Sequence, residues 1–253
     1  DGVSKTATGP KAVGELASEF FHTVSKYDPD CEEFDKEFER KVSHAVREIE
    51  ANHMNYGATK SDSEPPSVEE VREALKDAAK KLHKSPGTDG VCNWMLVWGG
   101  ETVVQGLQTL FAAAWKAKHV PKAWRQGLVK FLPKNKAKSA QEISNFRPIS
   151  LISVIGKVFT KAWLPRLASK LVPNLPLEQG CGRKGQGSGE HLWAFMAMME
   201  DVIDGRDVQG TREAFAMFAD LHKCYDQVWR DGLYLALYAQ GVRGPMLQVV
   251  QAW

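Results

Sequence analysis

The chain has 253 residues, of which 43% are hydrophobic and 25% are charged, and its formal net charge at pH 7 is +2. This composition excludes a disordered protein and is sufficient for one large domain or two small ones. No apolar run approaches the roughly 18 residues needed to cross a bilayer, and no charged-then-apolar leader opens the chain. We therefore expect an intracellular protein without a signal peptide or a transmembrane segment.

The charges are distributed unevenly along the chain. Residues 1–90 carry 19 acidic and 13 basic side chains, whereas residues 91–170 carry 2 acidic and 13 basic ones, which gives the second segment a net charge of +11. A basic segment of this strength indicates a polyanionic partner, and nucleic acid is the commonest one. The alternative is an ordinary solvated basic face.

Helical patterns dominate the N-terminal part of the chain. Apolar residues recur at helical spacing over residues 11–27 and 31–51, which predicts an antiparallel pair of helices, and the stretch 52–66 has the composition of a loop. We expect residues 1–66 to form a helical N-terminal extension with a linker. Ser67-Val-Glu-Glu70 is a capping box and predicts a helix that continues to about Leu82.

The middle of the chain alternates turn, helix and strand patterns. Lys84-Ser-Pro-Gly-Thr-Asp-Gly90 has the composition of a tight turn, and residues 101–118 predict an amphipathic helix. Residues 128–134 alternate like a strand, residues 153–171 predict another helix, and the Gly-rich loop 177–190 precedes a further one. The expected buried side of the 101–118 helix consists of Val104, Leu107, Phe111, Ala114 and Trp115.

Lys134 and Arg147 are candidates for binding a triphosphate. A triphosphate needs positive groups at two or three places, and Arg supplies a bidentate fork while Lys supplies a mobile point charge. A strand that ends near Lys134 and a returning limb that contains Arg147 would hold both side chains over one groove. Because Lys130, Lys136 and Lys138 lie nearby, the alternative for Lys134 is membership of a solvated basic loop.

An unbroken apolar run leads into Asp220. Six apolar residues, Ala214 to Ala219, precede it, and a bounded run of this length is typical of a strand buried on both faces. A carboxylate at the end of such a strand is rigidly held and open to solvent, so that it can bind a hard cation such as Mg²⁺ together with substrate phosphates. The alternative is that Asp220 caps the following helix.

Four stretches, in this order along the chain, resemble motifs of reverse transcriptases. Lys84–Gly90 resembles a loop near the fingertips. Val120-Pro-Lys-Ala-Trp-Arg125 and the strand pattern that follows it resemble a Val-Pro-x-x-Trp-(Arg/Lys) segment and the first strand of the fingers. Asn145-Phe-Arg-Pro-Ile-Ser-Leu151 resembles a fingers signature. Phe218-Ala-Asp-Leu-His-Lys-Cys-Tyr-Asp-Gln-Val228 resembles the first palm motif, although Cys224 replaces the usual Ala. The closest likeness is to non-LTR (LINE-type) retrotransposons, and it covers about residues 84–240.

The resemblance implies a helix-rich α+β fold that is part of a right-hand polymerase, with the fingers at 67–205 and the start of the palm at 206–253. It implies an RNA-directed DNA polymerase that transfers nucleotides to a primer 3′-hydroxyl with two Mg²⁺ ions, Mn²⁺ being an alternative. The implied partners are an RNA template, a DNA primer and deoxynucleoside triphosphates, with no membrane. The implied location is the nucleus, after assembly in the cytoplasm.

Roles for single residues follow from the same resemblance. Asp220 is expected to be catalytic and to bind the metal together with Leu221. Four residues are expected to bind the nucleotide: Lys134, Arg147, Cys224 and Tyr225. Six basic residues are expected to bind nucleic acid: Lys84, Lys122, Arg125, Lys130, Lys136 and Lys138.

One component of this chemistry is missing from the chain. Two-metal transfer needs a second source of carboxylates; in this family it is an aromatic-x-Asp-Asp segment, and no Asp-Asp pair occurs here. We therefore expect a truncated portion of a longer polymerase, inactive alone but able to bind nucleic acid weakly. Two alternatives remain open. One is a non-catalytic reverse-transcriptase-like scaffold, as in a spliceosomal core protein, and the other is an acidic helical interaction module fused to an unrelated α/β domain.

Overall fold

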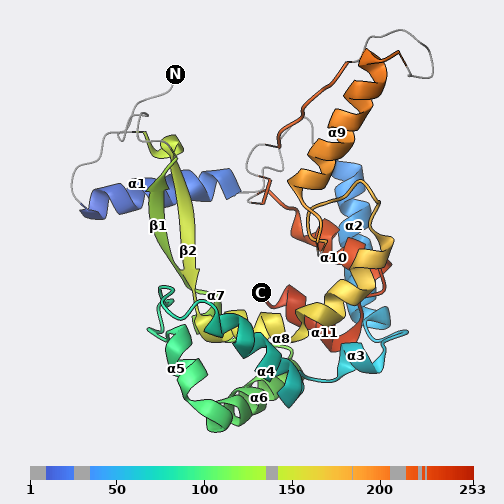
Figure 1. The fold of residues 1–253 in the computed structure, drawn as a ribbon. Helices are drawn as coiled ribbons and strands as arrows, with labels where there is room; N and C mark the ends of the chain where they lie inside the picture. The colour runs from blue at the N-terminus through green and yellow to red at the C-terminus, as the bar shows by residue number, and fades with distance from the viewer. Residues whose placement is uncertain are drawn as a thin grey trace. The chain divides into compact units, whose positions relative to one another are not determined.

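The computed structural model describes residues 10–25, 35–134, 142–183, 185–205, 215–221, 224–225 and 227–253. Helices account for most of these residues, and the strands among them form one antiparallel pair (Figure 1). The chain divides into two units, of which the first contains residues 1–167 and 225–253 and the second contains residues 168–224. Within the described ranges, no helix combines the length and apolar character needed to cross a membrane.

The N-terminal part of the first unit is helical, as the sequence predicts. It contains α1 (Pro10–Ser25) and α2 (Lys36–Glu48), and α2 continues into a π-helical turn over Ile49–His53. The Asp35 carboxylate caps α2, because it accepts two hydrogen bonds of 2.9 Å from backbone N–H groups of the first turn. This cap sets the point at which the helix begins.

The apolar face of α2 packs against α10 (Arg230–Ala239). The rings of Phe38 and Trp229 lie 6.1 Å apart, and the Ser43 hydroxyl donates a hydrogen bond of 3.4 Å to the Asp231 carboxylate. This packing does not test the predicted antiparallel pairing of α2 with the helix over residues 11–27, which stays a prediction. Periodicity shows which face of a helix is buried, but it does not show which helix covers that face.

Four further helices surround the core of the first unit. They are α3 (Lys60–Ser63), α4 (Val68–Ala79), α5 (Asn93–Trp98) and α6 (Gly100–Ala117). The predicted capping box opens α4, because the backbone N–H of Ser67 donates to Glu70 at 2.7 Å and the backbone N–H of Glu70 donates to the Ser67 hydroxyl at 3.2 Å. α4 ends three residues earlier than the sequence predicts, and the predicted apolar side of α6 is buried as expected.

Aromatic side chains from three helices form the centre of this core. Phe111 and Trp115 come from α6, Trp124 comes from α7 (Lys122–Arg125), and Phe159 and Trp163 come from α8 (Val154–Leu171). The ring centroids of neighbouring members lie 5.1–6.5 Å apart, mostly in edge-on or tilted arrangements. Burial of rings of this size dominates core energetics, so this cluster fixes how α6 and α8 cross.

A β-hairpin projects from these helices (Figure 1). It consists of β1 (Gly127–Pro133) and β2 (Phe146–Ile152), paired in antiparallel register with Leu132 opposite Arg147. The strand predicted at 128–134 is confirmed within one residue at each end. Side chains on both faces of the hairpin are partly or fully exposed, so it is not a layer of the core.

The first unit ends with α11 (Gly244–Gln251), which packs on α3 and α6. Met246, Leu247 and Val249 of this helix are buried, and the backbone N–H of Gly244 donates to the Met54 carbonyl at 2.8 Å. Residues from the two ends of the chain are therefore joined in one unit.

The second unit contains a 3₁₀ turn at Val172–Asn174 and α9 (Ser188–Ile203). The Gly-rich loop leads into α9 as predicted, and the backbone N–H of Gly187 donates to the Glu190 carboxylate at 2.7 Å. In Figure 1, α9 is the long orange helix.

The predicted buried strand at 214–219 is not formed. Residues 215–221 have no regular secondary structure, and the side chains of Phe215, Met217 and Phe218 are 97%, 92% and 85% exposed; Ala214 lies outside the described residues. A strand buried on both faces needs hydrogen-bonding neighbours and an apolar cover. The only sheet in the described part of the chain is β1–β2, and it supplies neither to this segment.

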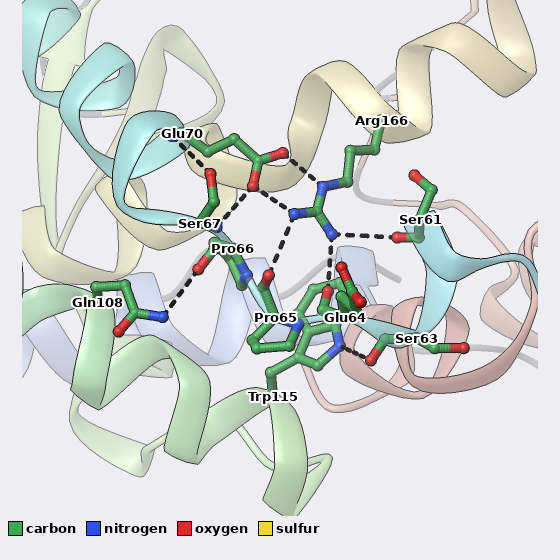
Figure 2. Close-up of polar contacts among 10 residues, drawn as sticks. All are labelled: Ser61, Ser63, Glu64, Pro65, Pro66, Ser67, Glu70, Gln108, Trp115 and Arg166. Atoms are coloured by element: carbon green, nitrogen blue, oxygen red, sulfur yellow. Dashed lines mark hydrogen bonds and ion pairs between the residues drawn. The ribbon is translucent and has the colours of Figure 1, made fainter.

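Arg166, near the end of α8, is the centre of a polar cluster (Figure 2). Its guanidinium binds both carboxylate oxygens of Glu70 on α4, with 2.5 Å between Nε and Oε1. It also donates to the backbone carbonyls of Ser61, Glu64 and Pro65 at 3.2, 2.7 and 3.1 Å. Burial opposes ionisation of Glu70, but the hydrogen bonds from Arg166 and the Ser67 backbone and the charge of Arg166 lower the pKa of Glu70 below its ordinary value.

Two side chains from α6 complete this cluster. The indole N–H of Trp115 donates to the Ser63 carbonyl at 3.0 Å, and the Gln108 amide donates to the Pro66 carbonyl at 3.3 Å. Five carbonyl groups of the 61–66 segment thus accept hydrogen bonds from side chains of α6 and α8: those of Ser61, Ser63, Glu64, Pro65 and Pro66.

Replacing Arg166 with Ala should lower the free energy of unfolding by about 3 kcal/mol, because the Glu70 carboxylate and three carbonyls lose their donor in a partly buried place. Urea denaturation followed by circular dichroism measures this loss. Lys76→Ala is the matched control, since Lys76 forms an ion pair with Glu73 in which both side chains are more than 60% exposed. That control should cost less than about 1 kcal/mol, and equal losses in the two variants would contradict the assigned role of Arg166.

Candidate nucleic-acid and nucleotide interface

The Lys84–Gly90 loop lies against the junction between β2 and α8. Gly87 is the point of closest approach: a Cβ atom added there would lie 2.6 Å from the backbone nitrogen of Ser153 and 2.7 Å from the carbonyl carbon of Ile152. Backbone atoms cannot move aside as flexible side chains do, so only glycine fits at this position. Gly90 closes the turn with φ +69°, and its N–H donates to the Gly87 carbonyl at 3.2 Å.

A buried serine joins this loop to α8. The Ser153 hydroxyl donates to the Asp89 carboxylate at 2.5 Å and accepts a hydrogen bond of 3.3 Å from the backbone N–H of Gly156, so it also caps the helix. Ser153 has no exposed surface. Since the second Asp89 oxygen accepts from the Val91 backbone N–H at 3.1 Å, both oxygens of this carboxylate are engaged in holding the loop.

The charges of the Lys84–Gly90 loop act on Lys157 of α8. Burial and, in second place, the positive charge of Lys84 lower the pKa of Lys157, while the charge of Asp89 opposes this shift. Lys157 is half-buried on the first turn of α8, and Lys84 is exposed on the loop. Lys157 at the base of the hairpin thus responds to both a positive and a negative charge of this loop.

The hairpin gathers three basic side chains on one face. Lys130 lies on β1 and Arg147 on β2, and Lys134 extends the pairing because its N–H donates to the Asn145 carbonyl at 2.8 Å. Opposed residues share a face of a hairpin, as do residues two apart in one strand. Lys134 and Arg147 are then diagonal neighbours, with Cβ atoms roughly 7 Å apart, and all three basic side chains are exposed.

The other predicted nucleic-acid contacts are also on the surface where the structure describes them. Lys122 and Arg125 are exposed at the two ends of α7, on either side of the buried Trp124. Lys136 and Lys138 lie outside the described residues.

The predicted catalytic residues are separated between the units. Asp220, Leu221 and Cys224 lie in the second unit, and Tyr225 begins the C-terminal part of the first. All four are exposed. Among the described residues, no group of three or more His, Cys, Asp or Glu side chains is placed to hold a metal ion. The metal-binding role of Asp220 and the grouping of these residues around one nucleotide stay predictions.

Ser153 and Lys157 are not among the predicted site residues, although Lys157 begins a Lys-to-Arg166-Leu167 pattern that resembles one of the same family. Ser153 is recognisable as a helix cap, because it directly precedes a helical pattern. Lys157 interrupts the apolar side of the predicted helix between Val154 and Val158, which is the available signal that this lysine is partly buried. Neither signal shows that both residues meet the Lys84–Gly90 loop.

Comparison of this chain with known proteins finds similarity to polymerases. No family profile matches it. It is similar to the RNA-directed DNA polymerases of non-LTR retrotransposons, the class that the motifs predict, and that prediction is confirmed.

Three of these relatives come from Drosophila melanogaster. The chain is 29% identical over 171 residues to the probable RNA-directed DNA polymerase from transposon BS. These aligned residues cover 67% of this chain and 18% of the relative. It is 26% identical over 157 residues to the probable RNA-directed DNA polymerase from transposon X-element, and the aligned residues cover 61% of this chain and 17% of that relative. It is 25% identical over 169 residues to the RNA-directed DNA polymerase from mobile element jockey, and the aligned residues cover 66% of this chain and 18% of that relative. The chain thus spans less than a fifth of the length of each.

Gly87→Ala should displace the Lys84–Gly90 loop from the β2–α8 junction, because the added methyl group meets backbone atoms. We expect a loss of about 1–3 kcal/mol in the free energy of unfolding and faster amide hydrogen exchange over residues 84–92. Gly106→Ala is the matched control: it lies inside α6 with nothing within 4 Å of an added Cβ, and it should stabilise the protein by about 1 kcal/mol. Unchanged exchange over 84–92 in Gly87→Ala would contradict the described position of the loop.

Proposed function

We propose that this chain is the fingers and the start of the palm of a non-LTR retrotransposon RNA-directed DNA polymerase with a right-hand fold. The observation that carries the proposal is the placement of Lys134 and Arg147 on one exposed face of the β1–β2 hairpin. A bidentate fork and a mobile ammonium at this separation suit the oxygens of a triphosphate. The similarity to RNA-directed DNA polymerases supports a deoxynucleotide as the ligand.

The proposed reaction is attack of a primer 3′-hydroxyl on the α-phosphorus of a deoxynucleoside triphosphate, with pyrophosphate as the leaving group and RNA as the template. Asp220 supplies a carboxylate oxygen and Leu221 a backbone carbonyl oxygen, both hard donors that fit Mg²⁺ or Mn²⁺. A metal ion held there would neutralise charge that develops on the phosphate. Lys134 and Arg147 hold the phosphates, Tyr225 and Cys224 lie against the nucleotide, and the remaining basic residues bind the nucleic-acid backbone.

The proposal requires a second carboxylate source beyond the described residues. Asp220 and Leu221 offer two of the oxygen ligands that an octahedral ion needs, and two ions need more. We therefore propose that this chain alone binds nucleic acid but does not polymerise. A non-catalytic scaffold is the weaker reading, because the relatives are named as polymerases and this chain retains both Asp220 and Tyr225. The proposed place of action is the nucleus, after cytoplasmic assembly.

In the complete polymerase, Asp220→Asn should abolish nucleotide incorporation while leaving the fold intact, because it removes a charged metal ligand and almost no volume. Losing transition-state stabilisation of this kind costs several kcal/mol, or at least about a hundredfold in kcat. Primer extension on a primed RNA template measures this. Glu178→Gln, an exposed carboxylate of the same unit, is the control and should retain full activity. Normal turnover of Asp220→Asn would refute the metal-binding assignment.

Arg147→Ala should raise the KM for deoxynucleoside triphosphates and lower kcat, since a fork that holds the transferring phosphates acts in the ground state and the transition state. A hydrogen bond to a charged group contributes about 1.5–3 kcal/mol, so kcat/KM should fall roughly tenfold to a hundredfold. Lys116→Ala is the control: it removes one positive charge from another exposed side chain, on α6, and should change neither KM nor kcat. If Arg147→Ala weakens only template binding, at all nucleotide concentrations, then Arg147 contacts the nucleic-acid backbone and the triphosphate assignment is wrong.

A further inference from the structure

α5 presents a pair of tryptophans to solvent. Trp94 is 37% exposed and Trp98 is 72% exposed, and their ring centroids lie 5.4 Å apart with an angle of 53° between the planes. They are four residues apart and therefore lie on one face of the helix. Leu96 and Asn93 on the other side of α5 are buried. By contrast, the tryptophans of α6, α7 and α8 are at most 5% exposed.

The tryptophan pair is held on a fixed support. The buried Asn93 amide donates to the Lys81 carbonyl at 2.7 Å and to the Ala78 carbonyl at 3.4 Å, so the start of α5 is bonded to the end of α4. α5 also packs against α6. These contacts fix the orientation of the helix, so the backbone that carries the two rings need not move before they bind a ligand.

Two exposed lysines, Lys81 and Lys84, lie in the segment that joins α4 to α5. Lys81 is joined to α5 through its backbone, Lys84 follows it, and neither forms an ion pair within the described ranges. The carboxylate of Asp77 on α4 is already engaged, since hydrogen bonds from Lys161 and Lys80 lower the pKa of Asp77 to about 2. Glu101, which follows the pair in the sequence, is held by Arg72 through two hydrogen bonds of 3.0 Å.

We propose that Trp94 and Trp98 form a stacking platform for unpaired bases of a single-stranded nucleic acid, whose phosphates are bound by Lys81 and Lys84. Aromatic rings stack on any base, and exposed lysines in the segment that precedes α5 attract the backbone. The core of a protein interface is depleted in lysine, so the same lysines argue against a protein partner. The inference rests on the proposed function in that the strand is an unpaired template, and it is independent of chemistry at Asp220.

Fluorescence anisotropy with a labelled oligouridine and a labelled oligothymidine tests the platform on this chain, without nucleotides. Trp98→Ala should weaken binding about fivefold to a hundredfold, the range that corresponds to 1–3 kcal/mol of stacking per base, and Trp98→Phe should retain most of the affinity. Trp193→Ala removes a ring that is 73% exposed in the second unit and is the matched control. It should change nothing. A larger loss on oligouridine than on oligothymidine would assign the platform to RNA, and equal losses would assign it to any unpaired strand.

Salt dependence separates the rings from the lysines. Stacking neutralises no phosphate, so Trp98→Ala should leave the slope of log affinity against log salt unchanged. The double variant Lys81→Ala, Lys84→Ala should make that negative slope shallower by about 1.4, since each phosphate contact on a single strand contributes about 0.7 to its magnitude. Thermal unfolding of each variant verifies that it is folded; if Trp98→Ala is not, the comparison of Trp98→Phe with a Trp98→Leu variant carries the same test.

Three results would overturn the platform. They are unchanged affinity in Trp98→Ala, an equal loss on a blunt duplex and on a single strand, or loss of self-association without loss of nucleic-acid binding, which would make the pair a protein interface. Failure of the polymerase proposal gives a different result. In that case Asp220→Asn would retain nucleotide incorporation in the complete protein, while the dependence of strand binding on Trp98 would persist.

Discussion

The first unit depends on one guanidinium. Arg166 joins α8 to α4 through Glu70 and, through three carbonyl groups, fixes the 61–66 segment on which α11 rests by way of α3 (Figure 2). Without Arg166, these three carbonyl groups would lose a charged donor in a partly buried place. A lysine would not replace this arginine, because one ammonium cannot bind a carboxylate at two oxygens and also reach three carbonyls in a plane. The charge of Arg166 is thus used for folding and not for binding a ligand.

α8 carries this constraint to the surface where binding is proposed. Its last turns hold Arg166, its middle contributes Phe159 to the aromatic cluster, and its first turn receives the Lys84–Gly90 loop through Ser153. The helix follows directly from β2, so the orientation of the hairpin and of its basic face is set at the same junction. A phosphate-binding side chain needs a support that holds it to within a fraction of an ångström. Here the support is a packed helix end and not the hairpin itself, which is exposed on both faces.

The sequence predicts the local elements well and their partners poorly. α4, α6, α8 and the first strand of the hairpin are predictable because capping residues and apolar periodicity act over a few residues. The partner of α2 and the carbonyl partners of Arg166 are not, because they are roughly 100 or more residues away in the sequence and depend on how the helices pack. The apolar run before Asp220 illustrates the same limit. Its composition is that of a buried strand, but burial depends on neighbouring strands that the described residues do not supply. For the site, the chemistry of Lys134 and Arg147 is readable from residue type, whereas their common face follows only from the register.

The two uses of tryptophan in this chain separate folding from binding. Trp115 and Trp163 are almost completely buried, and their indole rings stabilise the crossing of α6 and α8 by packing against Phe159. Trp98 leaves most of its ring in water, where it forgoes about 2 kcal/mol of the stabilisation that burial of a large side chain provides. A ring that is 72% exposed contributes little to the stability of the folded chain, and a polar side chain at that position would serve solubility better. The energy of covering the ring is instead available to a ligand, and the adjacent positive charge selects a ligand that carries both flat apolar surfaces and phosphates.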